Sequence, residues 1–152
     1  MLQMMLRSAL FHGIAEPAVT AIAAFSELMV FGVGAQVIVE GDGRHLDLLL
    51  LVDGEITVGT KFSPLPAAME FNLHAIGNEM LGEVAWILGN KRTANVHCKK
   101  ICKFIRIDGD KLFAYCHAHP AVGVELMTRV AAVLAQRVIH LTEQLRDKAL
   151  YS

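Results

Sequence analysis

A glycine, a carboxylate and an arginine stand close together in the chain and could bind a phosphorylated sugar. Gly82 and Glu83 open a short apolar segment, and Arg92 follows nine residues after Glu83. Gly82 lacks a Cβ, so it permits a sharp bend and the close approach of a ligand. If residues 83–88 form a short helix, its first amide groups have no partner within the helix and can bind an anion. Arg92 can add the forked contact that a guanidinium makes with phosphate, whereas Glu83 is suited to accept hydrogen bonds from sugar hydroxyls. These residue types predict a site for the sugar-phosphate of a nucleotide.

The segment around these residues resembles the phosphate-binding cassette of the cyclic nucleotide-binding domain family, of the catabolite activator protein and kinase regulatory subunit type. The family pattern is approximately Phe-Gly-Glu-(Leu/Ile)-Ala, a short spacer, and Arg-(Ala/Thr/Ser)-Ala. The chain has Leu-Gly-Glu-Val-Ala at 81–85 and Arg-Thr-Ala at 92–94. The family's glycine markers precede them in order, at Gly34, Gly41, Gly54 and Gly77. The resemblance extends from about Leu10 to about Arg146.

This resemblance implies the ligand and the residues that bind it. Glu83 would accept from the ribose 2′-hydroxyl, and Arg92 would bind the cyclic phosphate. The implied ligand-binding set is Gly82, Glu83, Val84, Ala85, Arg92, Thr93 and Ala94. The last helix should meet the base, with Arg137, His140, Leu141 and Thr142 as candidate contacts. A hydroxyl at Thr93 does not decide the base, and we favour cyclic AMP over cyclic GMP.

The chain also departs from the family pattern. Leu81 replaces the usual Phe, and Asn95 stands where a small hydroxyl residue is common. Arg44-His45-Leu46 lacks the usual pattern of a small, an acidic and an aromatic residue. None of these changes removes a ligand of the phosphate or the ribose. They leave open a second hypothesis, in which the fold is kept as a dimerisation or protein-interaction module with a non-functional pocket.

Composition limits the class of protein. The chain has 152 residues, of which 54% are hydrophobic, and this suits one domain with a sizeable core. No apolar run approaches the length of a membrane span, and a net charge of -1 predicts no nucleic-acid surface. The three cysteines form no CxxC pair, so we expect free thiols in the cytoplasm. If the resemblance holds, His97, Cys98 and Cys102 lie on alternating strand faces, and we expect no metal.

The expected fold is mainly β, an eight-stranded jelly-roll-like β-roll with N-terminal helices and a long C-terminal helix, forming one domain over 1–152. Helices are expected within 1–25, as pieces at 1–11 and 16–25 broken at Gly13. The β-roll should span 28–107 with the cassette at 77–96, and the C-terminal helices 109–148. Short apolar runs separated by turns predict strands at 29–31, 36–40, 46–52, 56–60, 69–73, 94–98 and 102–107. Asp108 is a predicted helix cap, and Pro120 a predicted helix start.

The last helix carries an apolar row suited to pairing with a second copy. Its members recur at alternating steps of four and three: Met127, Ala131, Leu134, Val138, Leu141 and Leu145. This spacing predicts a homodimer, although the row could instead pack on the roll.

Together these features predict a cyclic nucleotide sensor that binds its ligand, catalyses no reaction and moves its C-terminal helix. No segment after that helix matches a helix-turn-helix, so we expect a stand-alone domain that acts through an unknown downstream protein.

Overall fold

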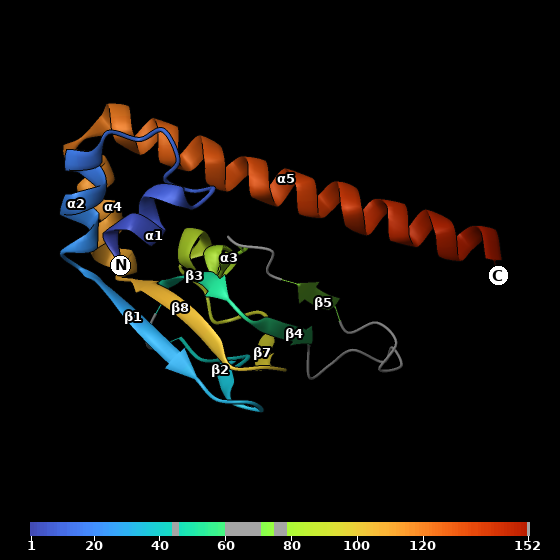
Figure 1. Ribbon diagram of the computed structural model, residues 1–152. Helices are drawn as coiled ribbons and strands as arrows, with labels where there is room; N and C mark the ends of the chain where they lie inside the picture. The colour runs from blue at the N-terminus through green and yellow to red at the C-terminus, as the bar shows by residue number, and fades with distance from the viewer. Residues whose placement is uncertain (44–45, 60–70, 75–78, 152) are drawn as a thin grey trace.

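The structure, a computed structural model, combines two β-sheets with helices gathered at one side (Figure 1). It describes residues 1–43, 46–59, 71–74 and 79–151. The helices are α1 (Leu2–Arg7), α2 (Glu16–Ala23), α3 (Glu83–Leu88), α4 (Gly109–Ala118) and α5 (Pro120–Tyr151). The strands are β1 (Ser26–Phe31), β2 (Gln36–Ile38), β3 (Leu48–Asp53), β4 (Glu55–Gly59), β5 (Phe71–His74), β6 (Glu79–Leu81), β7 (Asn95–Cys98) and β8 (Cys102–Ile107). The predicted fold class is confirmed.

The strands form two antiparallel sheets, and strands that follow each other in the chain mostly belong to different sheets. One sheet has the order β1-β8-β3-β6 and the other the order β2-β7-β4-β5. The chain therefore crosses repeatedly between the sheets, as a roll requires. The start of the predicted strand at 69–73 and Gly77 lie outside the described residues.

Strand β3 separates two apolar clusters. Leu48 and Leu50 pack with the helices and with Trp86, whereas Leu49 and Leu51 pack inside the roll with Phe104. All four leucines are buried, as a continuous apolar run in a strand requires when both of its faces are covered. Strand β3 thus lies between the roll interior and the helices.

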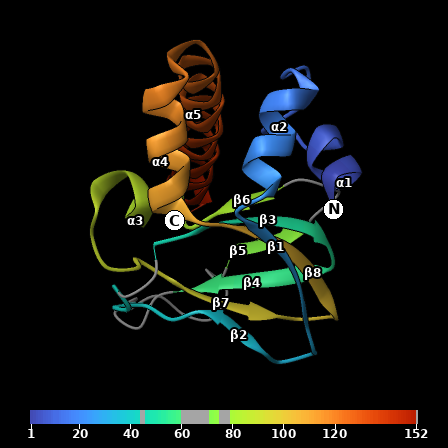
Figure 2. The same ribbon diagram turned by 90° about the vertical axis from the view of Figure 1, so that its left-hand side faces the viewer.

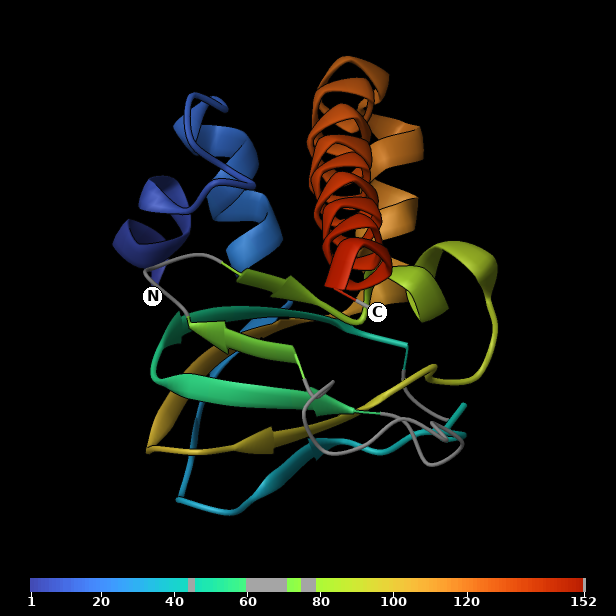
Figure 3. The same ribbon diagram turned by 90° about the vertical axis from the view of Figure 1, so that its right-hand side faces the viewer.

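The helices cover the sheet that contains β3. Figures 2 and 3 show α1 and α2 as one group and α4 and α5 as another, both on the same side of the roll. Arg129 of α5 joins the groups by donating to the carbonyl oxygen of Leu10 at 3.0 Å. The predicted cap is confirmed, since Asp108 accepts from the amide of Lys111 at 3.0 Å. None of the helices in the described ranges is both long enough and apolar enough to cross a bilayer.

Two local predictions were wrong. The first helix ends at Arg7 and not at the predicted Phe11, because Ser8 is extended and its hydroxyl donates to the carbonyl oxygen of Met5 at 2.7 Å. Strand β6 was not predicted, and it pairs with β3 through Leu81, Met80 and Glu79. A three-residue strand has too short a pattern to be recognised without its partner.

Candidate functional site

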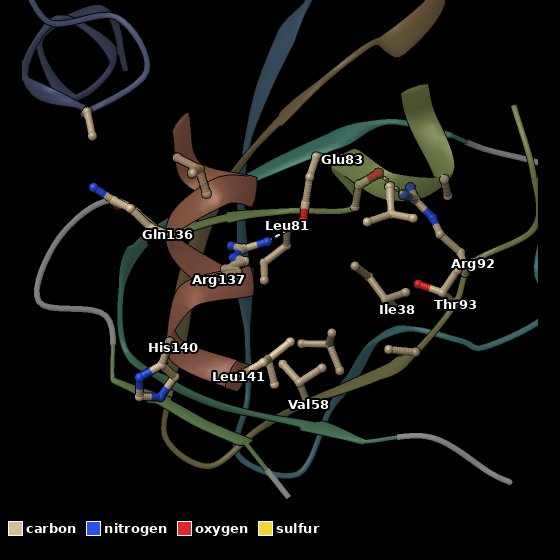
Figure 4. Close-up of a pocket in the computed structure, with 17 residues that line it drawn as sticks. Ile38, Val58, Leu81, Glu83, Arg92, Thr93, Gln136, Arg137, His140 and Leu141 are labelled. Carbon is tan, nitrogen blue, oxygen red and sulfur yellow. Dashed lines mark hydrogen bonds and ion pairs between the residues drawn. The ribbon is translucent and has the colours of Figure 1, made fainter. Parts of the chain in front are cut away.

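A cavity of about 500 Å³ lies between the roll, the segment around α3 and the middle of α5 (Figure 4). Its lining comes from strands, the α3 region and α5, and one residue of the N-terminal segment. The lining residues are Ala9, Ile38, Val58, Leu81, Gly82, Glu83, Val84, Ala85, Arg92, Thr93, Ala94, Val96, Val133, Gln136, Arg137, His140 and Leu141. Most of them are apolar, so the cavity combines apolar walls with a few polar groups, as small-molecule sites commonly do.

Glu83 supplies a buried carboxylate on the wall formed by α3. It is the first residue of that helix, and only 4% of its surface is exposed. Arg137 of α5 donates to its carboxylate through Nη1 and to the carbonyl oxygen of Met80 through Nη2 (Figure 4). A buried carboxylate is stable only with such a partner. The ion pair therefore connects α5 to α3 across the cavity wall.

Arg92 supplies a buried guanidinium on the same cavity, 8% exposed. Its Nη1 donates to the carbonyl oxygen of Gly82 at 3.0 Å and its Nη2 to that of Asp47 at 2.8 Å. Burial lowers the pKa of Arg92, while the carboxylates of Asp47, Asp42 and Glu83 raise it. An arginine starts from so high a pKa that it stays charged. The site thus holds a fixed positive charge at the end opposite to Arg137.

Gly82 occupies a position that only glycine fits without strain. Its φ is +80°, in the left-handed region. A Cβ there would contact Nη1 of Arg92 and approach the carbonyl oxygen of Asp47 to 2.9 Å. The glycine therefore permits both the turn into α3 and the seating of the Arg92 guanidinium beside it.

The structure brings together nearly all of the predicted site residues. The seven predicted from the cassette all line the cavity, as do Arg137, His140 and Leu141 of α5. Thr142 is not among the lining residues, and its hydroxyl donates to the carbonyl oxygen of Val138 at 2.8 Å. On a helix, residue 142 points away from the side shared by 137 and 141.

Sequence reasoning missed part of the apolar lining. Ile38, Val58 and Val96 come from three strands of one sheet, and no local pattern marks them as neighbours of the cassette. Val133 and Gln136 could have been found, because each stands four residues before a predicted lining residue of α5, Val133 before Arg137 and Gln136 before His140. The helical spacing alone would therefore have predicted these two lining residues.

Asn95, one of the departures from the family pattern, has a structural role. Its side-chain oxygen accepts from Nε2 of Gln36 at 2.9 Å and from the amide of Glu40 at 2.8 Å. Both contacts hold the segment around β2 against β7 and beside the residues 92–94. The departure thus supports the cavity wall and removes none of its charged groups.

The cysteines lie away from the charged groups of the cavity. His97 and Cys98 lie on opposite faces of β7 as expected, but Cys98 and Cys102 are both buried in the interior cluster of the roll, so the expectation of alternating faces was wrong for the two cysteines. The short turn between β7 and β8 brings both onto one face, while His97 is exposed. Among the described residues no group of three or more His, Cys, Asp or Glu is arranged to hold a metal ion.

Comparison with known proteins shows which solved structures share this fold. No protein-family model matches the chain, and no curated protein matches its sequence. A cyclic nucleotide-binding domain from Methylobacillus flagellatus superposes with a TM-score of 0.80 at 20% identity, covering 97% of this chain and 83% of that one. The catabolite activator protein of Thermus thermophilus gives 0.70 at 21% identity, covering 93% of this chain and 63% of that one. The regulatory domain of a Toxoplasma gondii PKA, crystallised with cAMP, gives 0.59 at 20% identity, covering 75% of this chain and 42% of that one. The likeness in structure, together with the arrangement of the cassette residues, identifies the chain as a domain with the cyclic nucleotide-binding fold.

Proposed function

We propose that the chain is a sensor that binds a cyclic nucleotide in the cavity between α3 and α5. One observation carries the proposal: Glu83 and Arg92, predicted as sugar and phosphate ligands, are both buried and both line this cavity. The solved structure of similar fold that contains cAMP supports the same class of ligand. The role is one of binding, with no catalytic step.

The cyclic phosphate would lie at the Arg92 end of the cavity. The carbonyl oxygens of Gly82 and Asp47 orient the guanidinium by hydrogen bonds of 3.0 and 2.8 Å. A guanidinium has five N–H donors, so it can hold two carbonyls and still present its charge to an anion. Gly82 allows the ligand to approach the backbone beside it.

The ribose and the base would extend from there toward α5. The Glu83 carboxylate accepts from Arg137, and it has lone pairs enough to accept from a sugar hydroxyl as well. Leu141 lies farther along α5 and points toward the strands, where it would meet the base, whereas His140 lines the cavity from the other side of the helix (Figure 4). Thr93 lies beside Arg92, and we favour cyclic AMP over cyclic GMP there.

Binding would be transmitted by a change in the position of α5. Arg137 holds α5 to Glu83, the same carboxylate that the ribose would use. A ligand that binds more tightly to one arrangement of α3 and α5 shifts the population toward it. The sensor output is then the position of α5.

Calorimetry with cyclic AMP and cyclic GMP tests the proposal. We expect saturable heat from at least one nucleotide, weakened at least tenfold in Arg92→Lys, because a lysine cannot reproduce the forked contact. Arg146→Ala, which removes an exposed arginine of α5, is the matched control and should bind as the wild type does. An absence of heat from both nucleotides at millimolar concentration would refute the proposal.

We also propose that two copies pair along the outer half of α5. Met127 and Leu134 of the predicted row pack on the domain's own core, but Val138, Leu141 and Leu145 are 61%, 41% and 66% exposed. Exposed apolar side chains at this spacing on a 32-residue helix suit a helix-to-helix contact. Sedimentation of Leu145→Asp should give a lighter species than the wild type. Equal masses would contradict pairing through this row.

The second candidate function is a dimerisation or interaction module whose pocket stays empty. It is favoured by the internal partners of the two site charges, since Glu83 contacts Arg137 and Arg92 contacts two carbonyl oxygens. A dimer that forms without ligand, combined with no heat from either nucleotide, would support this alternative.

A further inference from the structure

Asp47 connects Arg92 to the beginning of α4. This residue stands directly before β3, and its carbonyl oxygen accepts from Nη2 of Arg92 at 2.8 Å. Its side chain reaches in another direction, where Oδ1 accepts from the backbone amide of Gly109 at 3.1 Å. Gly109 is the first residue of α4, and its amide has no acceptor within that helix. One residue therefore contacts both the site arginine and the first turn of α4.

Gly109 is also held from the side of α3. The indole nitrogen of Trp86 donates to the carbonyl oxygen of Gly109 at 2.9 Å, and the ring of Trp86 stacks on Phe113 of α4 at a centroid distance of 4.3 Å. The space around Gly109 is fully occupied, since a Cβ there would contact the carbonyl oxygen of Leu46 and approach Cδ1 of Trp86 to 2.7 Å. Asp47 and Trp86 thus hold the two polar backbone groups of the same residue, the amide and the carbonyl of Gly109.

We propose that Asp47 is a positioning residue that transmits a change at Arg92 to the first turn of α4. A shift of the Arg92 guanidinium changes its bond to the Asp47 carbonyl, and the buried surroundings of Arg92 leave it little freedom to move alone. Because residue 47 cannot move its backbone without its side chain, the shift reaches the amide of Gly109. The packing around Gly109 then passes it to α4, which leads directly into α5.

The first test uses the protein without ligand. Amide hydrogen exchange is followed by NMR at Gly109 and, as a reference for overall stability, at Ile22 of α2. Arg92→Lys should raise exchange at Gly109 relative to Ile22 by about fivefold, the factor that corresponds to one ordinary hydrogen bond. In an Asp47→Ala background the same substitution should have no further effect at Gly109. An unchanged ratio in Arg92→Lys, or an equal rise in both backgrounds, would overturn the proposal.

Two variants separate transmission from simple loss of a helix cap. Asp108→Ala also removes an acceptor from the first turn of α4, the one for Lys111, but Asp108 has no contact with Arg92 among the described hydrogen bonds. The Asp108→Ala variant should still show the rise in amide exchange at Gly109 that Arg92→Lys causes. Asp47→Asn keeps an oxygen acceptor for the Gly109 amide and should restore the response that Asp47→Ala abolishes. Loss of the response in Asp108→Ala, or no rescue in Asp47→Asn, would mean a merely structural role.

A second test uses saturating cyclic AMP and rests on the proposed function. The nucleotide should slow exchange at Gly109 in the wild type and in Asp47→Asn, at saturation established by calorimetry for each variant, but not in Asp47→Ala. Equal slowing in Asp47→Ala would overturn the proposal. If the wild type binds neither cyclic nucleotide, the proposed function fails, and the test without ligand still decides the role of Asp47.

Discussion

Replacing Arg92 by alanine should destabilise the protein even when no ligand is present. The guanidinium joins three parts of the site, because it lies on the segment after α3 and donates to the carbonyl oxygens of Gly82 and Asp47 at 3.0 and 2.8 Å. Hydrogen bonds from a charged donor contribute about 1.5–3 kcal/mol each. Since burial of the charge opposes part of this gain, we expect a net loss of about 3 kcal/mol, or a fall in Tm of about 6–12 °C for a domain of this size.

Urea unfolding monitored by circular dichroism measures this loss. Arg146→Ala, the exposed arginine on α5, should change the free energy of unfolding by no more than about 0.5 kcal/mol. Arg92→Lys should fall between the wild type and Arg92→Ala, because an ammonium keeps the charge but cannot span two carbonyl oxygens. A loss below about 1 kcal/mol in Arg92→Ala would refute the view that this side chain anchors the site.

Three further predictions concern Gly82, Arg137 and Cys98. Gly82→Ala should lower both stability and nucleotide affinity, because φ is +80° and a Cβ would contact Arg92; wild-type values in calorimetry and thermal unfolding would contradict this. Arg137→Ala should destabilise the protein by about 1.5–3 kcal/mol and raise amide exchange in the middle of α5, because it leaves the Glu83 carboxylate without its partner. Burial, and then a hydrogen bond with Cys102, raise the pKa of Cys98 from 9.0 to about 12, so the folded state keeps a proton that the unfolded state loses. Stability should therefore fall as pH rises from about 9 toward about 12, with a shallower fall in Cys98→Val, and parallel urea-midpoint profiles for the two proteins would contradict this.

The sequence was sufficient for those parts of the site that lie within one short segment. Gly82, Glu83 and Arg92 fall within eleven consecutive positions, and their types alone predicted a turn, a helix start and a charge beside it. Strand β3 could be predicted equally well from the sequence, because four consecutive leucines have to be buried on both faces.

The rest depended on contacts between distant segments. Strand β6 exists because β3 lies next to it, and nothing within residues 79–81 signals that pairing. Arg137 was expected near the base, but its ion pair with Glu83 spans 54 positions and depends on how α5 lies across the roll. Asp47 went unnoticed because its importance lies in its position between Arg92 and Gly109 rather than in any local pattern.

Leu141 belongs both to the cavity wall and to the exposed apolar row of α5, and this affects any titration of the protein with a ligand. It lines the cavity, yet 41% of its surface is exposed in the apolar row of α5. If a second chain covers that row, it also changes the wall against which a ligand packs. By mass action, the measured dissociation constant of the nucleotide then varies with the protein concentration in the cell of the calorimeter. Dilution series would therefore give information on assembly and on the pocket in a single measurement.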